Sequence, residues 1–118
     1  MQNHAKVVII GGGVVGCSIL YHLSKFGLKD CILLERNELT SGSSWHAAGN
    51  VHVISSDPNI SRMMAYTIGL YKEIEKESGH SVGFKPSGGF YLASNDVWAE
   101  YLKSCLLYTS DAADDSLG

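Results

Sequence analysis

The sequence has 118 residues, of which 45% are hydrophobic and 18% are charged, a balance typical of a small globular domain. Its formal net charge is −3, and the last fourteen residues contribute Asp111, Asp114 and Asp115 to it. The rest of the chain sets nine of the twelve acidic side chains against all nine basic ones, so no basic face is available to bind nucleic acid. No apolar run reaches the roughly twenty residues that a membrane span needs. We therefore expect neither a nucleic-acid partner nor a membrane partner.

The three cysteines, Cys17, Cys31 and Cys105, form no C-x-x-C pair and are odd in number. This pattern argues against both a disulfide framework and a structural zinc site. The spacing of the histidines suggests no metal site either. We therefore expect a reducing cytoplasm and no bound metal.

The first predicted element is a strand at residues 6–10, KVVII, because a continuous β-branched run is typical of strands buried on both faces. A glycine-rich segment, GGGVVG, follows at residues 11–16. Apolar residues then recur at helical spacing as far as Gly27, a natural helix terminator. Residues 31–35, CILLE, form a second apolar strand that ends in a carboxylate. This order predicts an α/β fold with a Rossmann-like βαβ unit, in which the strands are parallel and the crossover is right-handed.

The glycines of this segment satisfy the G-x-G-x-x-G pattern between a strand and a helix. Gly11 permits the tight turn out of the strand, Gly13 lets the backbone approach a pyrophosphate, and Gly16 lets the helix pack closely on the sheet. The amides near Val14 and Val15 then face the ligand from the helix N-terminus, where the helix dipole favours negative charge. The segment is therefore predicted to bind a dinucleotide; a purely structural glycine turn is the alternative.

Glu35 stands at the tip of the second strand, about twenty residues after Gly16. A carboxylate at that distance can accept hydrogen bonds from both ribose hydroxyls of an adenosine. It would also repel a 2′-phosphate, so NADP is disfavoured. These residues leave NAD and FAD both open.

The segment SGSSWHAAGN, residues 41–50, sets Trp45 and His46 in a run of otherwise small residues. Together with the residues that follow Glu35, it resembles the FAD-binding N-terminus of the dimethylglycine and sarcosine dehydrogenase family, within the glycine-oxidase-like flavoproteins. In that family the histidine of a matching Gly-Ser-Thr-Trp-His-Ala-Ala-Gly segment is joined covalently to the flavin, so the resemblance implies that His46 is the attachment residue. Ser44 stands where the family commonly has Thr, and Asn50 where Leu is common; neither change touches the imidazole.

The residue types around His46 suit the attachment that the resemblance implies. A neutral imidazole nitrogen is nucleophilic and can add to the 8α-carbon of a flavin, while small neighbours let the chain follow the edge of the ring. The link would keep the cofactor bound and tune its electronics, and the flavin itself would accept the hydride. The FAD contacts expected in this region are Arg36, Gly42, Ser43, Ser44, Trp45, His46, Ala47, Ala48 and Gly49.

A long helix is predicted after this loop. Asp57 and Pro58 are typical of an N-cap and a first helical residue, and Gly79 is a natural end. The expected buried face consists of Ile60, Met63, Met64, Thr67, Ile68, Tyr71 and Ile74.

Residues 82–94 are predicted to be extended with a bend at Pro86 and at Gly88 and Gly89, and residues 96–102 to form a further helix. By the resemblance, residues 1–80 are the N-terminal part of an FAD-binding domain and residues 81–104 begin a substrate domain.

The last segment has a different character. CLLYTSDAAD, residues 105–114, resembles the translation of a sequencing adapter in one reading frame. We therefore expect residues 105–118 to be a non-native tail that truncates a longer product; a natural acidic tail is the alternative. Because polar, acidic segments bury little apolar area, this tail is expected to pack poorly.

The resemblance implies a parent enzyme that oxidises the C–N bond of N-methylated amino acids such as sarcosine or dimethylglycine. Its expected partners are the methylated amine and, through regions beyond this chain, folate or an electron acceptor. The chain itself offers no catalytic residue and is expected to be inactive alone. Two alternatives stay open: an FAD oxidoreductase for another secondary amine such as methylaminobutanoate, and a cofactor-free binding or structural module.

Overall fold

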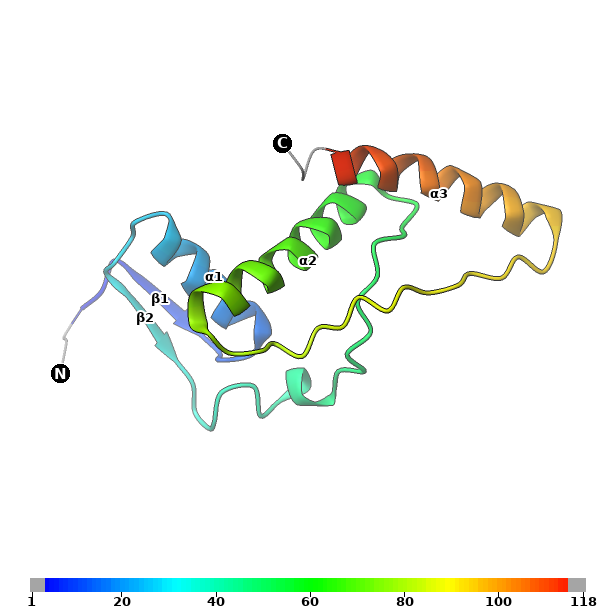
Figure 1. Ribbon diagram of the computed structural model, residues 1–118. Helices are drawn as coiled ribbons and strands as arrows, with labels where there is room; N and C mark the ends of the chain where they lie inside the picture. The colour runs from blue at the N-terminus through cyan, green and yellow to red at the C-terminus, as the bar shows by residue number, and fades with distance from the viewer. Residues whose placement is uncertain (1–3, 115–118) are drawn as a thin grey trace. The chain divides into compact units, whose positions relative to one another are not determined.

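The computed structural model describes residues 4–114, and the side chains of residues 4–106. The chain forms two compact units, Met1–Asn50 and Val51–Gly118. The expected division between residues 80 and 81 lies inside the second unit and stays a prediction about function. The elements of the first unit are β1 (Val7–Ile10), α1 (Val14–Lys25), β2 (Cys31–Leu34) and the short 3₁₀ helix η1 (Ser43–His46), and those of the second are α2 (Pro58–Ser78) and α3 (Asp96–Asp114) (Figure 1).

β1 and β2 form a parallel two-stranded sheet against which α1 packs (Figure 1). The register pairs Ile10 with Leu34, so both strands end at the same edge. The amide of Gly11 extends the ladder, because it donates to the carbonyl of Leu34 at 2.8 Å. Ile9, which is 7% exposed, lies on the side that meets α1 at Gly16. The predicted α/β fold and its parallel strands are thereby confirmed.

The first turn of α1 approaches the end of β1 more closely than a side chain would allow. Gly11 has a φ of +105°, a conformation that favours glycine. Its carbonyl oxygen lies where a Cβ on Gly16 would have to stand. The third glycine of the motif therefore permits close packing of helix on strand, as predicted.

α1 ends in the hydrogen-bond pattern of a Schellman motif. The amide of Gly27 donates to the carbonyl of Ser24 at 2.9 Å, and the amide of Leu28 donates to the carbonyl of Leu23 at 2.9 Å. The helix therefore stops where the sequence predicted, because Gly27 occupies the position just beyond its last turn.

The ends of α2 are also those predicted. The carboxylate of Asp57 caps the helix by accepting hydrogen bonds from the amides of Asn59 and Ile60, at 2.8 Å and 3.3 Å. Pro58 occupies the first helical position, and Gly79 ends the helix with a φ of +69°.

The buried side of α2 differs from the prediction in its first turns. Ser61 is fully buried, whereas Ile60 and Met63 are 37% and 58% exposed. The Ser61 hydroxyl donates to the carbonyl of Ser55 at 3.3 Å, so the inward side of this turn faces the backbone that leads into the helix. Farther along, the predicted residues are half-buried: Met64, Thr67, Ile68, Tyr71 and Ile74.

An irregular, extended connection leads from α2 to α3, which contacts α2 (Figure 1). The amide of Ser87 donates to the carbonyl of Lys85 at 2.8 Å, a local hydrogen bond across Pro86, where the bend was predicted. α3 continues to Asp114, well past the predicted end at residue 102.

Cys105, the first residue of the expected tail, is fully buried, so the expected poor packing is wrong for this side chain. Its burial follows from its place on α3, because that helix packs on α2. The side chains of residues 107–114 and all of residues 115–118 lie outside the described part of the chain. The non-native origin of the tail stays a prediction.

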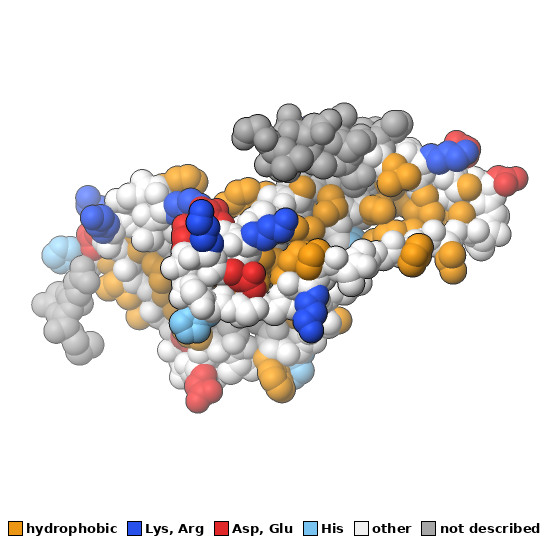
Figure 2. Space-filling model, viewed as in Figure 1, with side chains coloured by type: hydrophobic (Ala, Val, Ile, Leu, Met, Phe, Trp, Pro, Cys, Tyr) orange, Lys and Arg blue, Asp and Glu red, His pale blue; other side chains and the backbone are white. Residues whose placement is uncertain are grey.

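Exposed hydrophobic side chains gather along α3 and the connection before it (Figure 2). Phe90, Leu92 and Val97 are 99%, 92% and 79% exposed.

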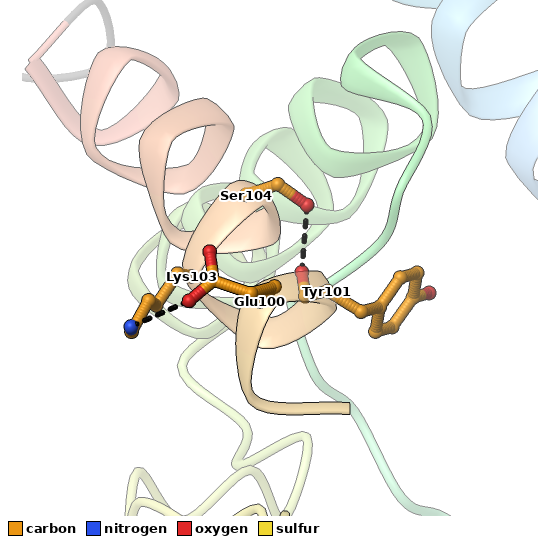
Figure 3. Close-up of polar contacts among 4 residues, drawn as sticks. All are labelled: Glu100, Tyr101, Lys103 and Ser104. Carbon is orange, nitrogen blue, oxygen red and sulfur yellow. Dashed lines mark hydrogen bonds and ion pairs between the residues drawn. The ribbon is translucent and has the colours of Figure 1, made fainter. Parts of the chain in front are cut away.

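An ion pair joins Lys103 Nζ to Glu100 Oε1 at 2.8 Å on α3 (Figure 3). Both side chains are mostly exposed, and such pairs contribute less than about 1 kcal/mol. The contact with α2 therefore matters more for the placement of α3 than this ion pair. No helix in the described range is long and apolar enough to cross a membrane.

We expect Gly16→Ala to lower the free energy of unfolding by about 1–3 kcal/mol or more, since its Cβ would collide with the backbone of Gly11. Gly69→Ala is the matched control, because a Cβ there meets nothing within 4 Å. Because Gly69 lies inside a helix, Gly69→Ala should raise the free energy of unfolding by about 1 kcal/mol. Urea unfolding of both variants measures the difference, and a Gly16→Ala protein as stable as wild type would contradict the close approach.

Candidate functional site

The carboxyl ends of β1 and β2 form the edge at which ligands bind in open parallel α/β sheets. Gly11 follows β1 and leads through a short turn into the N-terminus of α1. Glu35 follows β2 directly. A backbone turn, a helix N-terminus and a carboxylate therefore meet at one edge of the sheet.

The N-terminus of α1 presents amides that the helix itself leaves without partners. Its N-cap residue, Gly13, makes no side-chain cap. The amide of Val14 donates instead to the hydroxyl of Ser44 at 2.8 Å. The described part of the chain supplies no acceptor to the amides of Gly13, Val15 and Gly16. Because the helix dipole adds positive potential here, this turn suits an anion.

Two backbone amides fix the carboxylate of Glu35. Oε2 accepts a hydrogen bond from the amide of Gly12 at 2.7 Å, and Oε1 accepts one from the amide of Asn37 at 2.9 Å. Both bonds hold the pKa of Glu35 below its ordinary value, and the bond from Gly12 has the larger effect. The carboxylate is therefore ionised at neutral pH, and its remaining lone pairs can accept bonds from ligand hydroxyls.

Gly12 is the residue whose importance the sequence analysis missed. Its amide holds Glu35, and its carbonyl accepts a hydrogen bond from the amide of Thr40 at 2.9 Å. A Cβ at this position would press on the side chains of Leu39 and Glu35. The only signal in the sequence was that Gly12 is the middle of three consecutive glycines, at a position that the motif pattern leaves open.

η1 carries His46 at its last position. The Nδ1 atom of His46 lies 3.1 Å from the carbonyl oxygen of Gly42. A carbonyl only accepts, so Nδ1 carries the proton and the lone pair of the neutral ring lies on Nε2. The imidazole is exposed, and the ring of Trp45, 74% exposed, stands edge-on to it with centroids 6.3 Å apart.

The structure brings one group of the predicted residues together at the sheet edge: Gly11, Gly13, Val14, Val15, Gly16, Glu35 and Ser44. The others are exposed residues in η1 itself and on the chain that flanks it: Arg36, Gly42, Ser43, Trp45, His46, Ala47, Ala48 and Gly49. The latter group is placed by the turn of η1 and not by a buried pocket.

Other described parts of the chain carry fewer groups that could bind a ligand. Val97, Trp98 and Tyr101 line a hollow of about 230 Å³ on α3, and none of them carries a charge. Among the described residues, no three His, Cys, Asp or Glu side chains are grouped so that they could hold a metal ion.

A known protein family matches most of the chain. The FAD dependent oxidoreductase family, DAO, matches residues 6–113. The chain belongs to this family. Its fold is similar to the crystal structure of L-proline dehydrogenase from P. horikoshii, with a TM-score of 0.82 and 26% identity over 95% of this chain and 29% of that one.

Relatives within the family share this segment at higher identity. Dimethylglycine dehydrogenase, mitochondrial, from Homo sapiens is 44% identical over 102 residues, which cover 86% of this chain and 12% of that protein. The 4-methylaminobutanoate oxidase (formaldehyde-forming) of Paenarthrobacter nicotinovorans is 38% identical over 114 residues, which cover 97% of this chain and 13% of that protein. A human sarcosine dehydrogenase is also a relative. The predicted family resemblance is confirmed, and the chain spans about an eighth of the length of such relatives.

We expect the stability contributed by Glu35 to depend on pH. Because the folded pKa is lowered, ionised Glu35 stabilises the fold above the ordinary pKa of about 4.3. This contribution is lost as the pH falls through the folded pKa. Glu35→Gln should therefore be less stable than wild type at neutral pH, and the difference should shrink toward about pH 3.

Unfolding free energies at both pH values test this expectation. Glu38→Gln is the control, since the carboxylate of Glu38 makes no hydrogen bond within the described residues. A deficit of Glu35→Gln that stays constant across the pH range would show that the backbone amides do not stabilise the ionised carboxylate.

Proposed function

We propose that this chain binds FAD as the N-terminal part of an oxidoreductase that oxidises the C–N bond of an N-methylated amino acid, of the sarcosine or dimethylglycine type. The arrangement at the sheet edge carries the proposal, because unpartnered amides of α1 and the Glu35 carboxylate follow neighbouring parallel strands. A dinucleotide has the two groups that such an edge recognises, an anionic pyrophosphate and a ribose diol. Membership of an FAD dependent family favours FAD over NAD.

The residues at the edge fit the ADP half of FAD. The amides of Gly13, Val15 and Gly16 would receive the pyrophosphate, and Glu35 would accept hydrogen bonds from the ribose. The absence of a Cβ at Gly13 leaves the approach to these amides open, since only the Ser44 hydroxyl stands near it. When bound, the flavin would supply the hydride acceptor, and the chain would hold and orient it.

We also propose that His46 is the residue that binds the flavin covalently. The bond from Nδ1 to the Gly42 carbonyl leaves the lone pair on Nε2, which is therefore the nitrogen that would carry the link. Small neighbours, among them Ala47 and Ala48, leave room around the exposed ring.

The substrate could also be another secondary amine, and the relative named 4-methylaminobutanoate oxidase supports that second candidate. The residues at the sheet edge suit a cofactor and would not select the amine. The amine pocket, and any contact with folate or an electron acceptor, would come from other parts of the protein, so the chain alone should be inactive. The odd number of cysteines, with no C-x-x-C pair, supports a reducing compartment such as the cytoplasm.

In the full-length protein that carries this sequence, we expect flavin to stay with the denatured polypeptide and to fluoresce on a denaturing gel. His46→Ala should lose the fluorescent band but still take up FAD, because the glycine turn and Glu35 act on the other half of the cofactor. His52→Ala, an exposed histidine outside η1, is the control and should keep the band.

The outcomes separate the two parts of the proposal. If the wild type releases all its flavin on acid precipitation, the covalent role of His46 is wrong while the dinucleotide site stands. If the wild type is colourless and takes up no FAD, the flavin-binding function itself is wrong and a cofactor-free module is favoured.

A further inference from the structure

We infer that Ser44 is a positioning residue, whose hydroxyl ties the turn that carries His46 to the N-terminus of α1. Ser44 lies 30 residues from Val14 in the sequence, yet its Oγ accepts the hydrogen bond of the Val14 amide at 2.8 Å. A side chain from a distant loop thus takes the place of the missing N-cap side chain, since the N-cap residue is Gly13. The effect of this tether on flavin attachment rests on the proposed function.

A second anchor lies four residues earlier, at Thr40. Its amide donates to the carbonyl of Gly12 at 2.9 Å. Thr40 has a φ of +63°, which is strained for a β-branched residue and persists only when the surroundings hold it. The segment from Thr40 to Ser44 is therefore attached at both ends to the glycine turn.

Hydrogen bonds inside this segment transmit the position of the anchors to His46. The amide of Trp45 lies 3.1 Å from the carbonyl of Thr40, and the amide of Ala47 lies 3.3 Å from the carbonyl of Ser44. The imidazole itself bonds to the carbonyl of Gly42. Because Ser44 and His46 share the single turn of η1, release of Ser44 from α1 would let the imidazole move.

The tether also decides which amides remain for an anion. Val14 has one amide proton, and Ser44 accepts it, so an anion would bind the amides of Gly13, Val15 and Gly16. Ser44→Ala would free the Val14 amide without removing any of these three. Ser44→Ala should therefore disturb the placement of His46 and leave the affinity for the ADP half unchanged.

The test compares Ser44→Ala with Ser41→Ala in the full-length protein. Ser41 belongs to the same loop, but its hydroxyl donates to the carbonyl of Glu38 and does not reach α1. In cofactor-free protein, hydrogen exchange of the Val14 amide should accelerate about two- to tenfold in Ser44→Ala, the range expected from one net hydrogen bond. Ser44→Thr, which keeps a hydroxyl, should restore the protection, and Ser41→Ala should leave it unchanged.

Two further readouts separate positioning from direct binding. The rate at which saturating FAD becomes acid-stable should fall about two- to tenfold in Ser44→Ala, while the affinity for ADP stays within about twofold of wild type. A direct hydrogen bond to phosphate would instead cost roughly tenfold or more in ADP affinity. That result would overturn the inference.

Equal Val14 exchange in wild type and Ser44→Ala would also overturn it. Protected amides in the interior of α1 show that the Ser44→Ala protein is folded. If the wild type binds no FAD at all, the proposed function fails, but the exchange measurement still decides whether Ser44 tethers η1.

Discussion

The close approach of α1 to the end of β1 is the constraint on which the rest of the site depends. Because Gly16 has no Cβ, the first turn of α1 can stand against the carbonyl of Gly11. This contact brings the N-terminus of α1 to the edge where β1 and β2 both end. A helix held farther out would carry its amides and its dipole away from Glu35, and the positive potential of the dipole falls off within about one turn.

Gly12 fixes the neighbouring groups at this edge through hydrogen bonds of its backbone alone. Its amide orients the Glu35 carboxylate, and its carbonyl holds the loop that begins at Thr40. The bond from the same amide has the largest effect among the backbone hydrogen bonds that lower the pKa of Glu35, so it contributes to both the orientation and the ionisation of the carboxylate. The turn between β1 and α1, the carboxylate and the loop of His46 are thus coupled through one residue with no side chain.

Proteins named for dimethylglycine, sarcosine and 4-methylaminobutanoate share this segment. A segment common to proteins with different substrates is expected to serve the part of the chemistry that they have in common. The sheet edge described here agrees with that expectation, because its amides and carboxylate match a nucleotide and not an amine.

Neighbouring residues were enough to predict the strand order, the helix ends at Gly27 and Gly79 and the Asp57 cap, because hydrophobic period and capping depend on residues close together in the chain. Contacts between distant segments had no such signal. Periodicity placed Ile60 in the core, but the fold buries Ser61, whose hydroxyl bonds to the carbonyl of Ser55, and leaves Ile60 37% exposed. The bond between Ser44 and Val14 also joins segments that are distant in the sequence, and so do the two hydrogen bonds of Gly12. Only the folded chain establishes these pairings, because a local pattern specifies which face is apolar and not which partner that face meets.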